Sequence, residues 1–213
     1  MTDQLIERLV GDLKPQDLLI DSKLWAHCTV CLIVLSGAVL VIMGLRTDYP
    51  DALENGAMFW KPGIFLVCWI GSIFLILDFS RPTGKINKWH FTPILLAIAI
   101  FLWQIITQLP IFLTSEAITS LYDPNNVYCL AVILGGGGMT MAISWKFWFA
   151  KTASPKPATL GALAGFSVGC LAATAYALHC NKDGLLYILV FYGLPILALT
   201  VFGSFLSKKL LRW

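Results

Sequence analysis

The sequence predicts an all-α integral membrane protein with six transmembrane helices, and three observations support that fold class. First, 58% of the 213 residues are hydrophobic, only 13% are charged, and the mean hydropathy is +0.77. Such a chain is too apolar to fold around a single core in water. Second, its apolar residues gather in six stretches, each close to the roughly 20 residues that cross a bilayer as a helix. The stretches are Leu24–Leu45, Trp60–Leu77, Phe91–Ile111, Cys129–Trp148, Ala158–Leu178 and Leu185–Leu206.

The third observation is the distribution of Lys and Arg, which predicts how the helices are oriented. Basic residues concentrate in the short segments that stay in the cytoplasm. If the N-terminus lies inside, twelve of the fifteen Lys and Arg fall on the inner side. The outer loops then hold only Arg46, Lys61 and Lys182. We therefore expect the N- and C-termini in the cytoplasm.

Residues 1–23 form the only sizeable polar segment on the expected inner side. They contain charged side chains but no apolar core typical of a cleavable signal peptide. The loops between the stretches are too short for a second globular domain. We expect a cytoplasmic segment over residues 1–23 and a six-helix transmembrane domain over residues 24–213.

The N-terminal segment has the pattern of a short amphipathic helix over Asp3–Leu13. At about 100° per residue, its apolar side chains form one unbroken stripe, and Pro15 disfavours helical geometry at Lys14. A helix of about eleven residues is marginal in water and needs a surface to lie on. The segment carries five acidic and three basic residues, so an anionic membrane surface would repel it. A groove on a basic protein is therefore favoured over the membrane and over the protein's own inner loops. The predicted partner-binding residues are Leu5, Ile6, Leu9, Val10, Asp12 and Leu13.

Small residues recur every four positions in the fifth stretch, which predicts close helix packing. Gly161, Gly165 and Gly169 are continued by two alanines at the same spacing. The sequence leaves open whether the neighbour belongs to the same chain or to a second subunit. In the fourth stretch, Gly135–Gly138 indicates either close packing or a flexible point.

Two cysteines are expected at the outer ends of the fourth and fifth helices. Counting outward from the inner turn that joins these helices places Cys129 and Cys180 at similar heights, with His179 beside the latter. The geometry permits a disulfide, and two thiolates with an imidazole would also attract a soft or borderline metal ion. A sensory or redox role, an inert disulfide and unpaired packing thiols remain open alternatives, and no metal site is assigned.

Two other functional classes are less well supported. A transporter or channel would be expected to bury charged residues at mid-membrane, whereas Gln104 and Gln108 are the most polar groups within the third stretch. A thiol-redox membrane enzyme would need a reactive dithiol, but Cys28 and Cys31 lie in the inner part of the first stretch. We interpret these two as packing cysteines, expect no enzymatic activity or cofactor, and keep both classes as alternatives. Nothing in the sequence assigns a role to Cys68 or Cys170.

Both ends of the chain resemble the NrsF family of membrane anti-sigma factors, named for negative regulation of sigma F. The matching segments are Ala175–Cys180, Tyr187, Phe191–Ile196 and Leu210–Trp213, with Leu5–Pro15 at the opposite end. The resemblance implies a bacterial inner-membrane protein that holds an extracytoplasmic-function sigma factor inactive and frees it under stress. It also implies that the N-terminal helix binds the sigma factor, and that Cys129 and Cys180 are the family's paired outer cysteines. The expected partners are thus a sigma factor and the lipid bilayer, with no direct binding of nucleic acid.

Overall fold

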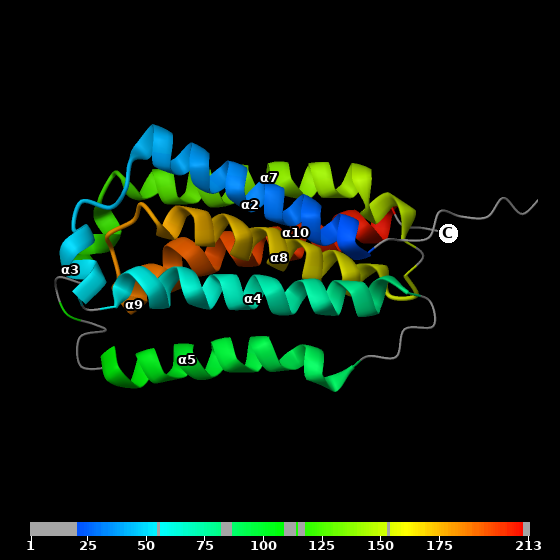
Figure 1. The fold of residues 1–213 in the computed structure, drawn as a ribbon, viewed down its shortest axis with the longest axis horizontal. Helices are drawn as coiled ribbons and strands as arrows, with labels where there is room; N and C mark the ends of the chain where they lie inside the picture. Colours follow the sequence, from blue (N-terminus) through cyan, green and yellow to red (C-terminus); the bar gives the residue numbers. More distant parts are fainter. Residues whose placement is uncertain are drawn as a thin grey trace, which may run out of the picture.

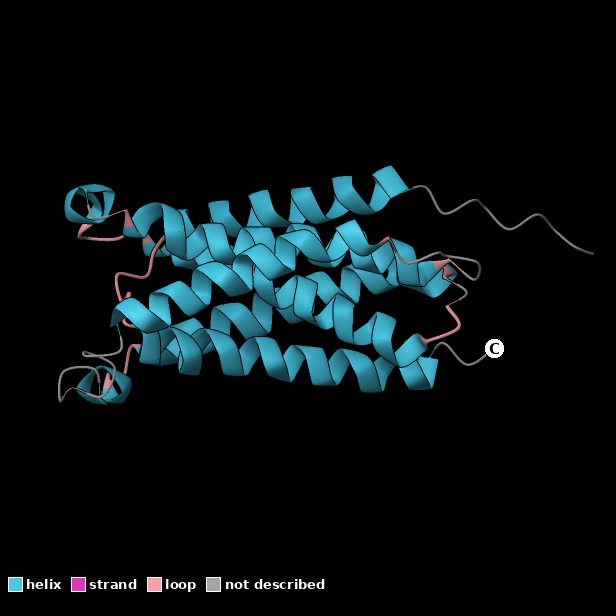
Figure 2. Cartoon of the chain, turned by 90° about the horizontal axis from the view of Figure 1, so that it is seen from below, coloured by secondary structure: helices cyan, strands magenta, loops and turns pink. Residues whose placement is uncertain are grey.

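The computed structural model describes residues 21–54, 56–81, 87–108, 114, 118–152 and 154–210, which form a bundle of long helices (Figures 1 and 2). Six spans in this part of the chain are long and apolar enough to cross a membrane, which confirms the predicted fold class. The first five spans are α2 (Asp21–Met43), α4 (Ala57–Ser80), η1 with α5 (Lys88–Phe91 and Thr92–Gln108), α7 (Asn126–Phe147) and α8 (Pro157–Ala177). The sixth is continuous through α9 (Leu185–Ile188), the π-helix η5 (Leu189–Gly193) and α10 (Leu194–Leu210). The shorter elements are α3 (Tyr49–Glu54), η3 (Ser120–Tyr122) and η4 (Phe149–Lys151).

Helix α8 is the central helix of the bundle. It packs against α10, α4, α7 and α2, and most of its side chains are buried. Its glycines allow this because they bring backbones into contact: a Cβ atom added to Gly165 would lie 2.0 Å from the carbonyl oxygen of Leu199 on α10. At Gly161 the same atom would lie 2.2 Å from the carbonyl oxygen of Gly203. The glycines of α8 thus admit a close neighbour, which in this structure is a helix of the same chain.

The glycine run of α7 serves packing at two of its four positions. A Cβ atom on Gly136 would lie 2.9 Å from the side chain of Leu35 on α2, and one on Gly137 would lie 2.6 Å from the side chain of Leu199. Gly135 and Gly138 face open space. Helix α7 continues without a break through all four glycines.

Helix α5 lies at the periphery of the bundle (Figure 1). It packs mainly on α4, where Gly71 admits Pro93 and Ile94 to close contact. The rest of its surface is apolar and exposed, as expected for a helix that faces lipid.

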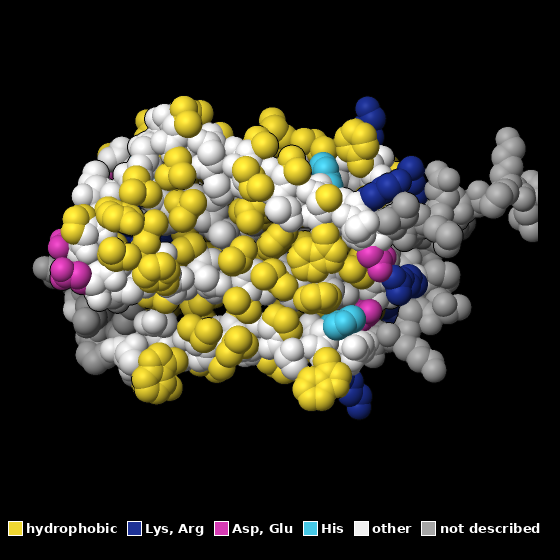
Figure 3. All heavy atoms as spheres, in the orientation of Figure 1, with side chains coloured by type: hydrophobic (Ala, Val, Ile, Leu, Met, Phe, Trp, Pro, Cys, Tyr) yellow, Lys and Arg dark blue, Asp and Glu magenta, His cyan; other side chains and the backbone are white. Residues whose placement is uncertain are grey.

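Charged side chains differ between the two ends of the bundle (Figure 3). Lys and Arg gather where α4 and α10 end and α8 begins, which we call the basic end. The opposite end carries α3 and the α8–α9 loop, and we call it the α3 end. Helix α2 starts at the basic end, where Asp21 pairs with Arg81. The described part of the first span begins at Asp21, three residues before the predicted start at Leu24.

Candidate functional site

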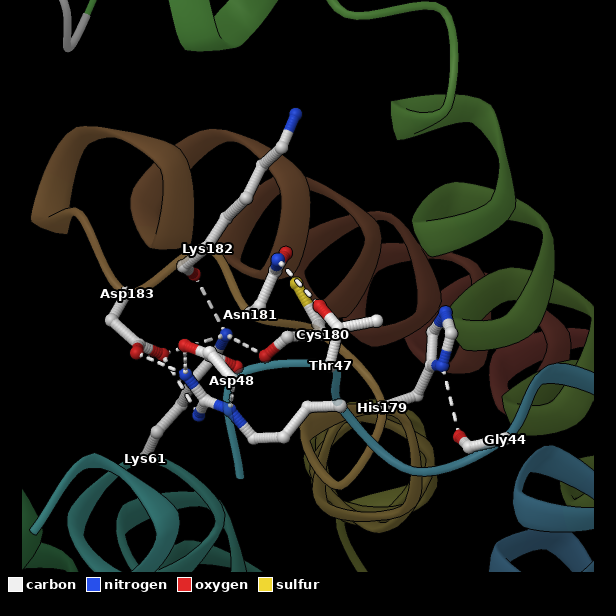
Figure 4. Close-up of polar contacts among 10 residues, drawn as sticks. Gly44, Thr47, Asp48, Lys61, His179, Cys180, Asn181, Lys182 and Asp183 are labelled. Carbon is white, nitrogen blue, oxygen red and sulfur yellow. Dashed lines mark hydrogen bonds and ion pairs between the residues drawn. The ribbon is translucent and has the colours of Figure 1, made fainter. Parts of the chain in front are cut away.

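The loops at the α3 end are joined by a buried network of charges (Figure 4). Arg46 follows α2, and its fully buried guanidinium donates to Asp48 at 2.8 Å and to Asp183 at 2.6 Å. The hydrogen bonds from Arg46 hold the pKa of Asp48 below its ordinary value, and Asp48 in turn raises the pKa of Arg46. The network ties the α2–α3 loop to the α8–α9 loop, 137 residues later.

Lys61 enters the same network from the first turns of α4. Its side chain has no exposed surface. Its ammonium donates to the carbonyl oxygens of Cys180, at 3.1 Å, and Lys182, at 2.7 Å, and lies 3.2 Å from Asp183. It also lies 5.2 Å from the ring centroid of Tyr192, a cation–π contact. Asp183 therefore neutralises one cation from the α2–α3 loop and one from α4, while Lys61 holds the backbone on both sides of residue 181.

A second ion pair fixes the start of α7. The ammonium of Lys182 contacts Asp123 at 2.5 Å and the side-chain oxygen of Asn126 at 3.1 Å. The hydrogen bond from Lys182 lowers the pKa of Asp123. Asn126 also donates to two carbonyl oxygens of η3, which positions the first turn of α7 beside the α8–α9 loop.

His179 binds the backbone rather than another side chain. Its Nδ1 lies 3.0 Å from the carbonyl oxygen of Gly44, which follows α2 in a left-handed conformation with φ of 83°. A carbonyl can only accept, so Nδ1 is the donor in this contact, and in the tautomer with its proton on Nδ1 the Nε2 atom is an acceptor. The backbone of Leu178 accepts from Arg46 N–H nearby, so that α2 and α8 are linked twice at this end.

The two thiols of the α3 end lie beneath these loops. Cys129 on α7 and Cys180 after α8 are both buried and free, and they are close enough to influence each other electrostatically. Tyr187 interacts with both thiols. The thiol of Cys129 donates to the carbonyl oxygen of Phe191 at 3.3 Å. Phe191 belongs to η5, so the thiol contacts the irregular turn in the sixth span.

Comparison with known proteins decides the family. The family described as negative regulator of sigma F, NrsF, matches residues 9–213. The chain belongs to the NrsF family. This confirms the resemblance seen at the two ends of the sequence. The probable anti-sigma-F factor NrsF of Azospira oryzae is 27% identical over 183 residues, which cover 84% of each chain. The anti-sigma-F factor NrsF of Caulobacter vibrioides is 27% identical over 183 residues, with 83% of each chain covered. No solved structure matches the chain.

The NrsF-family fold brings Cys129 and Cys180 together, as their predicted heights require. It leaves them unpaired, and His179 binds Gly44 instead of completing a site with them. Across the described ranges, no three His, Cys, Asp or Glu side chains gather as they would to hold a metal ion. The predicted partner-binding residues lie outside the described part of the chain; they are Leu5, Ile6, Leu9, Val10, Asp12 and Leu13.

The remaining cysteines of this NrsF chain lie among packed helices. Cys28 is buried in the core, and Cys31 contacts His27 one turn away on the same helix. Cys68 on α4 faces Cys170 on α8. Nothing in the sequence indicates this second thiol pair, because the two residues are far apart in the chain and belong to no spacing motif.

Sequence reasoning also missed the charge network. The sequence pattern predicts that Arg46 and Lys61 are charges of the outer loops, whereas both side chains are buried and form ion pairs with Asp183. One signal is available in the sequence: each is a single cation within or beside an apolar stretch, and the seven-residue α8–α9 loop offers one acid. Buried cations of this kind are almost always paired.

Proposed function

We propose that this protein is an anti-sigma factor of the bacterial inner membrane. It holds an extracytoplasmic-function sigma factor inactive through residues 1–23 and releases it when the thiols of Cys129 and Cys180 react. Membership of the NrsF family is the observation that carries the proposal, because both relatives compared above are named as anti-sigma-F factors. Under this proposal the protein is a regulator and not an enzyme, and it does not bind nucleic acid itself.

The charge distribution supports a cytoplasmic position for the basic end. Lys and Arg favour the cytoplasmic side of membrane proteins. The three basic residues at the α3 end are all paired with acids, so that end presents no uncompensated cation among them. Because α2 starts at the basic end, the segment that precedes it is attached on the same side, where a sigma factor is accessible.

The apolar stripe of the N-terminal segment is the proposed binding surface. Five aliphatic side chains would enter a groove of a basic sigma factor, while the acidic face stays in solvent. A short helix that folds as it binds gives a moderate affinity, because ordering the segment costs free energy. Such a contact is readily reversed, as a stress response requires.

The proposed signal acts on the thiols at the α3 end. An oxidant that converts the two thiols to a disulfide takes up two electrons and two protons, and a soft metal ion displaces the thiol protons. In both cases Cys129 loses the S–H group that donates to Phe191. The freed carbonyl belongs to η5, which continues directly into α10. Helix α10 packs along the glycines of α8 toward the basic end, which provides a continuous path to the cytoplasmic side.

The binding surface is tested by replacing Leu9 and Leu13 with Asp. Membranes that contain the double variant should lose the co-purified sigma factor, while the amount of inserted protein is unchanged. The control variant Gln4→Asp/Gly11→Asp adds the same charge on the polar face and should retain the sigma factor. Retention by the Leu9/Leu13 variant would rule out the proposed surface.

The signal is tested with Cys129→Ser and Cys180→Ser, and Cys28→Ser serves as the matched control. A sigma-dependent reporter should respond to diamide and to cadmium in the control and in wild type, but not in either outer variant. A normal response in both outer variants would show that the two thiols serve only in packing, and it would leave the proposed sigma-binding surface untouched.

A further inference from the structure

A cavity of about 870 Å³ lies between α2 and α7 and reaches the loops of the α3 end. Small-molecule sites in proteins typically enclose about 300–1,000 Å³, so the cavity has room for a ligand. Its long walls are apolar, with Val39 and Ile42 on α2 facing Val132 on α7. The contact between Leu35 and Gly136 closes it toward the middle of the bundle. A transporter predicts a cavity lined by Gln104, Gln108 and the glycine-rich part of α7; Gly136 of that run lines this cavity, whereas Gln104 does not.

The length of the cavity matches one leaflet of a bilayer. Helix α7 rises about 15 Å from Gly136 to Asn126, at 1.5 Å per residue. The hydrocarbon core of a bilayer is about 30 Å thick, so the apolar walls cover the half nearer the α3 end. On α2, Ile42 both lines the cavity and is 81% exposed, so the cavity reaches the lipid-facing surface of the bundle at this residue. A molecule with an aliphatic chain can therefore enter from the membrane.

The rim of the cavity is polar but electrically balanced. Lys182 and Asp123 both line it and neutralise each other at 2.5 Å. His179 donates through Nδ1 to Gly44, and its Nε2 accepts no hydrogen bond among the described residues. Asn181 donates to Thr47 at 3.5 Å and keeps its side-chain oxygen as an acceptor. The rim thus offers acceptors to a hydroxyl group and has no unpaired charge to bind an ionic head.

We propose that this cavity binds an uncharged amphiphile with one aliphatic chain and a hydroxyl-bearing head, of the monoacylglycerol class. The chain lies between α2 and α7, and the head donates hydrogen bonds to His179 and Asn181. Cys180 lines the same cavity, so the bound molecule covers one of the two thiols. Binding of the amphiphile does not depend on the proposed anti-sigma function and is measured without a sigma factor.

The test uses the full-length protein in lipid nanodiscs and a monoacylglycerol that carries a photoactivatable diazirine in its chain. After irradiation, peptides of α2 and α7 should carry the label, as mapped by mass spectrometry. Unlabelled monoolein should compete at a concentration about tenfold lower than oleate, which has the same chain but a carboxylate head. A tenfold difference corresponds to about 1.4 kcal/mol. Equal competition by oleate would overturn the assignment of an uncharged head.

Two variants of α2 provide the matched control. Ala38 lines the cavity, and Ala38→Phe should fill it and lower specific labelling at least tenfold. Gly37 is the neighbouring exposed residue, and a Cβ atom there meets nothing within 4 Å, so Gly37→Phe should label like wild type. If both variants are labelled equally, or if the label extends equally to α5, the probe contacts only bulk lipid. Either result would overturn the proposal. If Ala38→Phe does not fold, the competition between monoolein and oleate on the wild-type protein still decides it.

Discussion

Replacing Gly165 with Ala should destabilise the bundle, because this glycine brings the backbones of α8 and α10 into contact. The added Cβ atom would lie 2.0 Å from the carbonyl oxygen of Leu199 and 2.6 Å from its carbonyl carbon. Close carbon–oxygen contacts in proteins lie at about 3.3–3.6 Å, so the helices must separate by roughly 1.3 Å. No side-chain rotation can relieve the clash, since the atoms it meets are backbone.

The expected size of the effect follows from two opposing terms. Overpacking of a tight core costs about 1–3 kcal/mol and sometimes more, and a backbone clash lies at the upper end of this range. Ala improves helix propensity by up to about 1 kcal/mol relative to Gly. The net loss is then about 2 kcal/mol, which lowers the melting temperature of a chain of this size by about 4–8 °C.

The measurement is thermal unfolding of the purified protein in detergent, followed by circular dichroism. Gly135→Ala is the matched control, because a Cβ atom there meets nothing within 4 Å. This control should melt at the wild-type temperature or slightly above it. Gly169→Ala should fall between the two, since its nearest contact is 3.2 Å. If Gly165→Ala and Gly135→Ala have the same melting temperature, backbone contact between α8 and α10 does not stabilise the bundle.

Three further predictions concern the α3 end, and all use the same melting assay. Lys61→Met should cost about 2–3 kcal/mol, because two carbonyls lose a charged donor in a buried site. Lys182→Met removes a partly exposed pair and should lower the melting temperature much less. Asp48 and Asp123 have pKa values below their ordinary 3.8, so they stabilise the fold above about pH 4 and lose this effect as the pH falls through their folded pKa values. The melting temperature should therefore fall as the pH is lowered below about 4, and it should fall less in the double variant Asp48→Asn/Asp123→Asn. An equal fall in the double variant would show that these two carboxylates do not cause the pH dependence. Cys129→Ser keeps a donor for Phe191 and should change stability little, whereas Cys129→Leu overfills a fully buried position and should cost about 1–3 kcal/mol.

The sequence was sufficient to predict the six spans, because length and hydropathy are local properties of the chain. It also placed the packing face of α8 correctly, since the four-residue spacing of Gly161, Gly165 and Gly169 is directly visible. The same holds for the meeting of Cys129 and Cys180, which required only that two helices joined by a short turn run antiparallel.

What the sequence did not predict depends on contacts between distant segments. Arg46 meets Asp183 only because α2 and α8 end at the same level, and Lys61 joins them only because α4 packs on α8. Positive charge in a loop is equally compatible with solvation and with burial in an ion pair. The cavity between α2 and α7 is likewise a property of helix packing, and the glycines of α7 did not reveal which of them would face it.

The charge network also sets an order of events during synthesis of the chain. Arg46 and Lys61 are made early, in the first loop and at the start of the second span, whereas Asp183 follows the fifth span. Until the ribosome has passed Asp183, Lys61 lacks the acid with which it forms an ion pair, and Arg46 has only Asp48. The α3 end of the bundle therefore cannot close during synthesis of the first five spans. It closes when the last loop arrives, just before the sixth span completes the bundle.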